Sequence, residues 1–417
     1  MATFEDLSFK QKLAHFEDVA RRALPLWGIE HTASLTLLNF TENATYAVES
    51  PSLAEKIIMR VSRTDYTSKE SVMSELAWMS ALRRDTDLSI PAPIPLRDGS
   101  FVGLVETPEL GEVRCVVCFT FAKGRAPVDS SDGNAEVGDL ISAIEPIPDG
   151  ITIPLFRSAA VILDKYERRN VQTKLSDADR QMYRTVGVIM AKMHVQSGQW
   201  QKPSYFTRMN WGFEGTFGEW NNFYGAKYND PAWISPQDAM TLNMVVDQIY
   251  NRLRAYGKTP DRWGVIHSDL RAANLLQDGD VMTVLDFDDC GEGWYMYDIA
   301  GAVALMEHRA DLFDIVAEIV AGYETVRPLS NEDKAEIPTF IMMRRLGMLQ
   351  SLICRIGCVA GGSGEVAELT PEILAFYAKG TVVLGKRYLH LCTLNEEAEE
   401  ESREARRILA QRQLTCA

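Results

Sequence analysis

The sequence predicts an α+β protein in which a small antiparallel-sheet lobe precedes a larger, mainly helical lobe. The chain has 417 residues, which is too long for one compact core and therefore predicts two lobes. Strand-like runs with one helix among them fill the first part of the chain, whereas helical periodicity dominates the later part. We expect the lobe boundary after residue 127, with an N-terminal lobe over 1–127 and a C-terminal lobe over 128–417.

The first lobe is predicted to open with an amphipathic helix over Asp6–Leu24. Runs that are apolar and rich in β-branched residues predict three strands, separated between the first two by a polar turn at Thr41–Asn43. These strands are expected at Ser34–Phe40, Thr45–Ser50 and Lys56–Val61.

A second helix is predicted after the third strand, with Ser68 as its N-cap. Its apolar residues recur at helical spacing at Val72, Leu76, Met79 and Leu82. The proline-rich segment Ile90–Pro95 ends this helix, and two further strands are expected on either side of Gly111. A sheet with one helix laid against it follows from this order.

The second lobe is predicted to be mostly helical. The acidic stretch Asp129–Gly150 is expected to form a loop or a local insertion. A helix is then expected from Asp177, and the segment Asn331–Gly357 is read as one or two buried helices.

Composition limits the kinds of protein and partner. The chain contains no run of eighteen apolar residues, so no membrane span is expected. Seven cysteines, an odd number, argue against a disulfide framework and favour the cytoplasm. The net charge of −15 argues against nucleic-acid binding and suits a cationic or neutral small-molecule substrate, although solubility alone also explains it.

The chemistry is concentrated between Gly264 and Asp298. A short apolar run delivers Asp269 to a loop, and a strand, an Asp-Gly turn and a second strand then separate Asn274 from Asp286. This construction brings the three side chains together at neighbouring strand ends. Two carboxylates and one amide oxygen form a hard-oxygen site suited to Mg²⁺, with one carboxylate left to accept a proton.

The pattern H-x-D-x-x-x-x-N followed by a D-F dipeptide resembles the catalytic and metal-binding loops that protein kinases share with aminoglycoside phosphotransferases. The resemblance implies a protein-kinase-like two-lobe fold and ATP as the phosphate donor. It also implies that Asp269 is the catalytic base, that Asn274 and Asp286 bind Mg²⁺, and that Asp298 braces the catalytic loop.

Arg271 lies two residues after the expected base, where protein kinases keep a lysine that steadies the transferring phosphate. An arginine can serve there through its charge, but a solvated loop arginine is an equally good interpretation. Asp288 and Asp289 are open to two interpretations, a second metal ligand or a turn cap.

In this fold a lysine on the third strand grips the nucleotide phosphates and pairs with a glutamate on the following helix. Alternation along the strand puts Arg60 at what looks like the lysine's place, and Lys56 ranks second. Glu75 is the expected helix partner, with Glu70 as the alternative. Arginine is always charged and can hold phosphate in a bidentate way, so the exchange need not abolish binding.

The first hairpin contains no G-x-G-x-x-G motif. Asn43, Thr41 and backbone N–H groups would then cover the phosphates. This resembles the glycine-poor hairpins of small-molecule kinases in the superfamily more than the loop of protein kinases.

The gap between Asp286 and Asp298 leaves no room for the activation loop of protein kinases. The helical remainder suits a cap that builds an acceptor pocket, and the SELAW–ALR–P-x-P–DG run resembles the aminoglycoside phosphotransferase and homoserine kinase type II-like group, which implies a small-molecule O-kinase. The expected acceptor is a hydroxyl of an amino acid, an amino alcohol or an aminoglycoside-like compound. A serine/threonine protein kinase of the stress-response type and a nucleotide-binding pseudokinase stay open as alternatives. Trp294 is the tryptophan that we expect in the acceptor pocket.

Overall fold

The structure is a computed structural model. It describes residues 4, 7–40, 43–63, 68–127, 175–219, 224–307, 309, 311–356, 359–362 and 365–415, with the backbone alone given for 359–362, 365–368 and 394–415. The expected acidic loop Asp129–Gly150 lies outside these residues, as does Thr41 of the first turn. The lobe boundary after residue 127 stays a prediction, because it falls at the edge of an undescribed segment.

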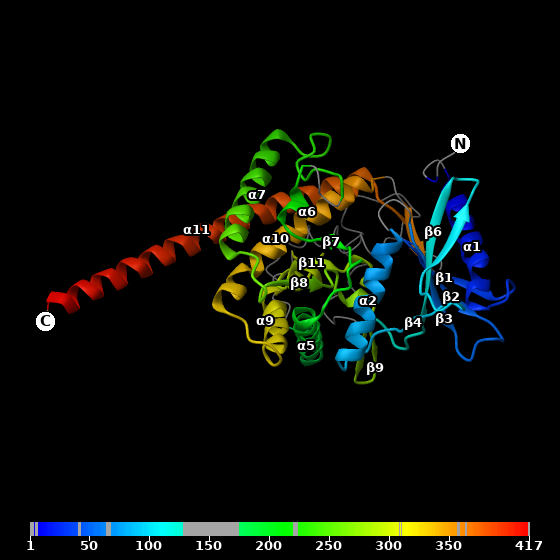
Figure 1. Cartoon of the computed structure of the whole chain (residues 1–417). Helices are drawn as coiled ribbons and strands as arrows, with labels where there is room; N and C mark the ends of the chain where they lie inside the picture. The colour runs from blue at the N-terminus through cyan, green and yellow to red at the C-terminus, as the bar shows by residue number, and fades with distance from the viewer. Residues whose placement is uncertain are drawn as a thin grey trace.

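An antiparallel sheet forms the first lobe (Figure 1). Its strand order is β13-β12-β1-β2-β3-β6-β4, and β5 pairs with β6 beside this path. The first six strands are β1 (Ser34–Phe40), β2 (Ala44–Glu49), β3 (Ile57–Val61), β4 (Pro93–Ile94), β5 (Gly103–Thr107) and β6 (Glu112–Thr120). The three strands predicted before the second helix are therefore confirmed, with ends that shift by at most one residue.

The last two strands of this sheet come from the far end of the chain. The hairpin of β12 (Val359–Gly362) and β13 (Glu365–Glu368) joins β1 through the pair Phe40 and Gly361. This hairpin was not predicted. Its first strand reads VAGG, and glycine-rich segments carry almost no periodic strand signal.

The sheet has a helix on each face. On the outer face, α1 (Phe9–Ala23) packs its buried Phe16 against the side chains of β3 that include Met59. On the inner face lies α2 (Lys69–Asp85), whose N-cap is Ser68 as predicted: its side chain accepts the N–H of Ser71 at 3.1 Å. Because alternate residues of β3 face opposite helices, Arg60 projects toward α2.

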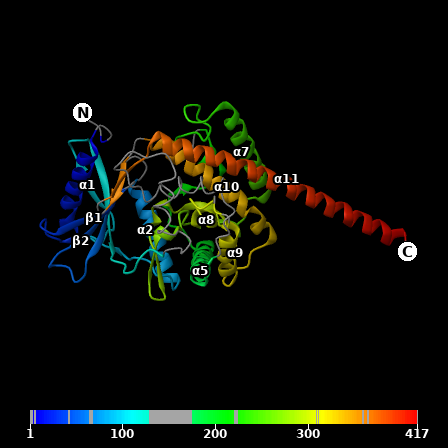
Figure 2. The same cartoon turned by 180° about the vertical axis from the view of Figure 1, so that it is seen from behind.

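The second lobe packs its helices around one large core that also includes the inner face of the first lobe. In chain order its helices are α5 (Asp177–Gln199), α6 (Phe213–Phe217), α7 (Pro236–Tyr256), α8 (Tyr297–Ala302), α9 (Leu312–Glu324), α10 (Asn331–Cys354) and α11 (Pro371–Thr415). Seen from behind, α10 and α11 run side by side before α11 leaves the body (Figure 2). The segment read as one or two buried helices is therefore the single helix α10.

Helices α5 and α9 approach to backbone contact. A Cβ on Gly187 would lie 2.0 Å from the carbonyl oxygen of Ile319, and one on Gly322 would lie 2.0 Å from that of Arg184. Only glycine fits at either position. The close crossing holds α5 firmly, and α5 carries a residue of the site.

Short strands deliver the loops of the site. A small sheet joins β7 (Met209–Asn210), β11 (Gly291–Trp294) and β8 (Trp263–Ile266), while β9 (Leu275–Asp278) and β10 (Val281–Val284) form the predicted hairpin. Gly279 turns this hairpin with a φ of +60°. The hairpin also touches the first lobe, since Ser89 Oγ and Thr283 Oγ1 lie 2.8 Å apart. Within the described part of the chain, no helix is both long and apolar enough to cross a membrane.

Candidate active site

The predicted catalytic loop begins where β8 ends. Ser268 has a φ of +67°, an unusual backbone conformation for a non-glycine residue. The carboxylate of Asp298 holds this turn by accepting the N–H of His267 at 3.0 Å and the N–H of Ser268 at 2.5 Å. Strain of this kind costs about 1–3 kcal/mol and persists only where surrounding contacts enforce it. Asp298 therefore braces the loop as the resemblance implies.

His194 on α5 supports Asp298 from behind. Its Nε2 lies 2.9 Å from Asp298 Oδ2, its Nδ1 lies 2.9 Å from Tyr323 Oη, and its ring stacks on Tyr295. Burial lowers the pKa of His194, although the charge of Asp298 opposes that shift. From the sequence, His194 lies at the polar edge of an apolar helix stripe, which favours a packing residue; the structure adds its bond to Asp298.

We call residues 285–290, which include Asp286, the metal loop, and His267 connects the predicted catalytic loop to it. Its Nε2 lies 2.9 Å from the carbonyl oxygen of Leu285, and its Nδ1 lies 3.4 Å from the N–H of Asp269. A carbonyl oxygen can only accept, so Nε2 carries the proton and Nδ1 accepts. The imidazole ring lies 4.7 Å from the ring of Phe287, which follows Asp286.

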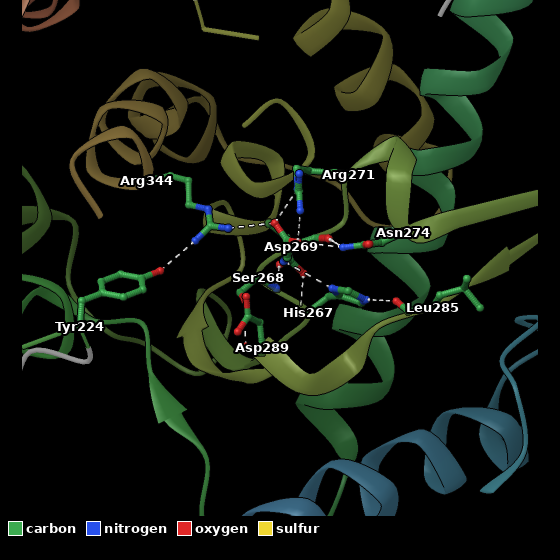
Figure 3. Close-up of polar contacts among 10 residues, drawn as sticks. Tyr224, His267, Ser268, Asp269, Arg271, Asn274, Leu285, Asp289 and Arg344 are labelled. Carbon is green, nitrogen blue, oxygen red and sulfur yellow. Dashed lines mark hydrogen bonds and ion pairs between the residues drawn. The ribbon is translucent and has the colours of Figure 1, made fainter. Parts of the chain in front are cut away.

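Asp269 accepts hydrogen bonds on both carboxylate oxygens (Figure 3). Arg271 donates to each oxygen at 2.9 Å, Arg344 donates to Oδ1 at 2.8 Å and Asn274 donates to Oδ2 at 2.8 Å. Burial alone would raise the pKa of Asp269, but the charges of Arg271 and Arg344 hold it well below its ordinary value. A carboxylate has about four acceptor sites, so these four donors occupy all of them.

Arg344 was missed by the sequence analysis. It projects from the middle of α10 and is buried. The pair Arg344-Arg345 inside an apolar helix was the available signal, since arginine is seldom buried without a specific partner. Its neighbour Arg345 has a different environment, because it pairs with Glu307 at 3.2 Å and lies over the ring of Tyr377.

The metal loop places two carboxylates together. Asp286 follows β10 with a φ of +60°, and its carboxyl group is close to that of Asp288. Desolvation and the charge of Asp288 raise the pKa of Asp286 well above its ordinary value. Crowded carboxylates of this kind favour a bound cation.

The donor set fits Mg²⁺. This ion binds through one or two carboxylates and keeps waters and substrate phosphates as its other ligands. Asp286 and the amide of Asn274 are hard oxygen donors on adjacent loops. Among the described residues there is no group of three or more His, Cys, Asp and Glu side chains arranged for a metal, as a dedicated protein cage would need.

Arg60 and Glu75 form the predicted pair. Arg60 Nη1 and Nη2 donate to the two oxygens of Glu75 at 2.8 and 2.7 Å, and both side chains are buried. Glu70, the alternative partner, is exposed at the start of α2. The charges of Asp286 and Asp288 also act on Arg60. The pair in the first lobe therefore lies opposite the metal loop of the second lobe, where a residue that binds nucleotide phosphates is expected.

The other two predicted nucleotide residues differ in position. Asn43 lies at the end of the first hairpin turn and donates to Asp288 at 2.6 Å, so the hairpin reaches the metal loop. Lys56 is exposed before β3 and stacks on the ring of Phe121 at 4.1 Å. Their roles in nucleotide binding stay predictions.

Arg208 is a second connection between the lobes that was not predicted. Its guanidinium donates to Ser71 Oγ on α2 and to the carbonyl oxygen of Cys290, each at 2.7 Å, and also to the carbonyl oxygen of Asp288. Arg208 thus fixes the start of α2 against the metal loop.

The expectation for Trp294 is wrong. Its indole packs in the core against Trp263 and Phe340 and donates to the carbonyl oxygen of Gly257. The tryptophan that contacts a partner of the predicted base is instead Trp211, because its ring centre lies 5.8 Å from the guanidinium of Arg344, which donates to Asp269. The position of helix α10, which carries Arg344, determines which tryptophan contacts this arginine. One sequence does not show where a helix packs in the fold.

The two-lobe fold and the grouping of the predicted base, the predicted metal ligands and the arginine–glutamate pair are those of a kinase-like phosphotransferase. A model of the phosphotransferase enzyme family matches residues 36–329, and the chain belongs to this family. The predicted enzyme class, a small-molecule kinase, and the predicted fold class are confirmed.

Similar proteins agree with this assignment. The structure of a microcompartment-associated aminopropanol kinase is 32% identical with a TM-score of 0.68, covering 89% of this chain and 97% of its own. An amicoumacin kinase from Bacillus subtilis (strain 168) is 23% identical over 348 residues, which are 81% of this chain and 84% of the relative. An amicoumacin kinase solved with AMP-PNP, Ca²⁺ and Ami shares the fold at 18% identity, with a TM-score of 0.64 and coverage of 90% and 96%.

Proposed function

We propose that this enzyme transfers the γ-phosphate of ATP, in the presence of Mg²⁺, to a hydroxyl group of a small molecule. The observation that carries the proposal is the placement of Asp269 and Asn274 beside the carboxylate pair of the metal loop, opposite the buried Arg60–Glu75 pair. Base, metal ligands and a cationic phosphate grip are what in-line phosphoryl transfer requires.

The reaction balances with these groups alone. The acceptor oxygen attacks the γ-phosphorus, the bond from that phosphorus to the β–γ bridging oxygen breaks, and ADP leaves with the electron pair. Asp269 takes the proton of the acceptor hydroxyl. Products are ADP and a phosphate monoester.

Asn274 and Asp286 would hold Mg²⁺, which neutralises phosphate charge as the leaving group departs. Arg60, oriented by Glu75, would bind the phosphates, and Asn43 would help the first hairpin to cover them. The amicoumacin kinase complex with AMP-PNP and Ca²⁺ supports the use of a nucleotide and a divalent cation by this fold.

Asp269 cannot accept a substrate proton while all four of its acceptor sites are occupied. At least one donor must leave. Arg271 lies on a loop with 21% of its side chain exposed, whereas Arg344 is 3% exposed on a helix. Arg271 is therefore the donor that moves, and the transferring phosphate is the negative charge toward which it moves.

The acceptor is an amino alcohol, an amino acid or an aminoglycoside-like compound, and the relatives that act on aminopropanol and amicoumacin support this range.

The cytoplasm is the proposed compartment. In support, Cys115, Cys118, Cys290, Cys354 and Cys392 are free thiols, as a reducing compartment requires.

An acceptor screen tests the function. ADP release is measured with ATP, Mg²⁺ and panels of amino acids, amino alcohols and aminoglycosides. Asp269→Asn should lower kcat on any active acceptor by roughly 10²–10⁴-fold, the usual contribution of a general base. The matched control is Asp278→Asn, the same exchange at an exposed position of the β9–β10 hairpin, which should retain activity. Equal rates for Asp269→Asn and the wild type would refute the assigned base.

A further inference from the structure

Arg344 lies in a cluster of large polar aromatic side chains that the phosphoryl-transfer chemistry does not use. We call Arg344, Trp211, Tyr224 and Tyr297 the Arg344 cluster. The guanidinium lies over Trp211 at 5.8 Å, and Nη1 lies 3.5 Å from Tyr224 Oη, at the limit of a hydrogen bond. Within the described residues, Nε of Arg344 is buried and makes no hydrogen bond. An unused donor of a buried cation is costly, which indicates a missing partner.

Tyr297 carries a second unused polar atom in the same cluster. Its hydroxyl is buried without a hydrogen-bond partner in the described part of the chain. Arg344 is close enough that its charge and its polar contact with the hydroxyl oppose the rise in the Tyr297 pKa that burial causes, so the free Nε of Arg344 and this hydroxyl lie side by side. Gly347, one turn further along α10, has no side chain beside these tyrosines. A Cβ built on Gly347 would lie 3.7 Å from Tyr224 and 3.9 Å from the Tyr297 hydroxyl, which is ordinary contact distance.

The position of the cluster assigns it to the acceptor and not to the nucleotide. Arg344 donates directly to Asp269, the proposed base, at 2.8 Å. It comes from α10 of the second lobe, whereas the nucleotide grip Arg60 comes from the sheet of the first lobe. A group that binds Arg344 would therefore lie next to the hydroxyl that Asp269 deprotonates.

The chemistry of the cluster selects the charge of that group. A guanidinium has only donors, so it repels an ammonium group and matches a planar carboxylate. Around Asp269 two guanidiniums, from Arg271 and Arg344, face one carboxylate. Asp289 is the other carboxylate whose charge acts on Arg344. Recognition of the carboxylate therefore rests on the free Nε donor of Arg344 and not on an excess of positive charge.

We propose that Arg344 and Tyr297 form a carboxylate subsite, so that the acceptor is a small hydroxy acid, such as an amino acid with a hydroxyl side chain. This inference rests on the proposed phosphoryl transfer to a small-molecule hydroxyl. The acceptor carboxylate takes the free Nε of Arg344 and the Tyr297 hydroxyl. Arg344 stays in place, which leaves Arg271 as the donor that releases Asp269.

Pairs of acceptors that differ by one carboxylate test the inference. Threonine and 1-aminopropan-2-ol share the same amine and hydroxyl, as do serine and ethanolamine, and homoserine and 3-aminopropan-1-ol. On the wild-type enzyme, kcat/KM for the acid of the active pair should exceed that for the amino alcohol by at least about 10-fold, the usual value of a charge-assisted hydrogen bond. An equal or higher value for the amino alcohols overturns the inference, while phosphoryl transfer still stands.

Two variants locate the subsite. Arg344→Met should abolish the preference within the pair, whatever its effect on the overall rate. Tyr297→Phe should lower kcat/KM for the acid by about 3–10-fold and leave the amino alcohol unchanged. Tyr205→Phe, the same exchange at an exposed tyrosine, is the matched control. If Arg344→Met lowers kcat equally on both members of the pair, Arg344 only positions Asp269 and the subsite is wrong.

Calorimetry separates the two proposals. The hydroxy acids are titrated into the wild type and into Arg344→Met without ATP. Binding to the wild type that is lost in Arg344→Met supports the subsite even if no acceptor yields ADP, an outcome that would refute the proposed function alone. Equal binding to both proteins refutes the subsite.

Discussion

At the scale of single residues, the site is built from charges that hold each other in place. Glu75 holds the guanidinium of Arg60 with two short hydrogen bonds, and both groups are buried. Arginine keeps its charge when buried, whereas lysine loses it more readily. The exchange of the expected lysine for Arg60 thus preserves a cation in a site that also contains Glu75, Asp286 and Asp288.

Removal of either member of this pair is predicted to have a distinct effect. Arg60→Ala should raise KM for ATP and lower kcat by at least about 10-fold, because the phosphates lose a bidentate donor.

Glu75→Gln should lower the free energy of unfolding by about 3–5 kcal/mol, since it leaves a buried guanidinium without its counter-charge. Steady-state kinetics and urea unfolding measure the two effects.

Lys56→Ala is the control for Arg60, because Lys56 is exposed and stacks on Phe121. We expect its KM for ATP to match the wild type. Unchanged kinetics for Arg60→Ala would show that Arg60 does not bind the nucleotide. A raised KM for ATP in Lys56→Ala alone would assign phosphate binding to Lys56.

At the scale of elements, helix α5 supports the catalytic loop without reaching the reacting groups. Its close crossing with α9 at Gly187 fixes the helix, and His194 on it holds Asp298, which in turn holds the strained turn at Ser268. The strained backbone of Ser268 is therefore held by contacts that begin on α5, a helix far from Ser268 in the sequence.

This arrangement predicts acid sensitivity. Burial lowers the pKa of His194 below the ordinary value of a histidine, so at mildly acidic pH the unfolded chain binds a proton that the folded protein does not. Stability is fully present above the unfolded pKa and falls as the pH drops below it, by about 1.4 kcal/mol per pH unit until the folded pKa is reached. Urea unfolding between pH 7.5 and 5 measures this slope.

His194→Gln keeps a donor for Asp298 but removes the titration, so its unfolding free energy should vary less over the same pH range. The control His31→Gln, at an exposed histidine, should keep the wild-type slope. An identical slope in His194→Gln would assign the acid sensitivity to other groups.

At the scale of the whole molecule, the end of the chain contributes to both lobes. The β12–β13 hairpin extends the first sheet, and α11 then packs on α10 and α7 before it projects from the body (Figures 1 and 2). The first half of α11 carries buried Tyr377 and Thr381, which bond Arg345 on the helix that also carries Arg344. The site therefore depends on this first half.

Two truncations test that dependence. A chain that ends after Thr393 keeps the buried residues described on α11, through Cys392, so its Tm should lie within about 2 °C of the full chain and its activity should be retained. A chain that ends after Leu369 loses Tyr377 and Thr381, the partners of Arg345 on α11, and should not fold to an active enzyme. Thermal melts and ADP release measure both, and an active short form would show that α10 holds Arg344 without α11.

Short-range patterns in the sequence are enough to predict the strands β1 to β3, the Ser68 cap, the β9–β10 hairpin and the loop that sets Asp269 beside Asn274. These features depend on neighbours within a few residues, so periodicity, turn chemistry and motif spacing predict them. Tertiary structure alone decided that Arg344 meets Asp269, which lies 75 residues away, and that His194 meets Asp298 across 104 residues. It also decided that β12 extends the first sheet and that Trp211, not Trp294, contacts Arg344. The physical reason is that such contacts depend on how helices cross and strands pair across the whole chain, and one sequence contains no record of those distances.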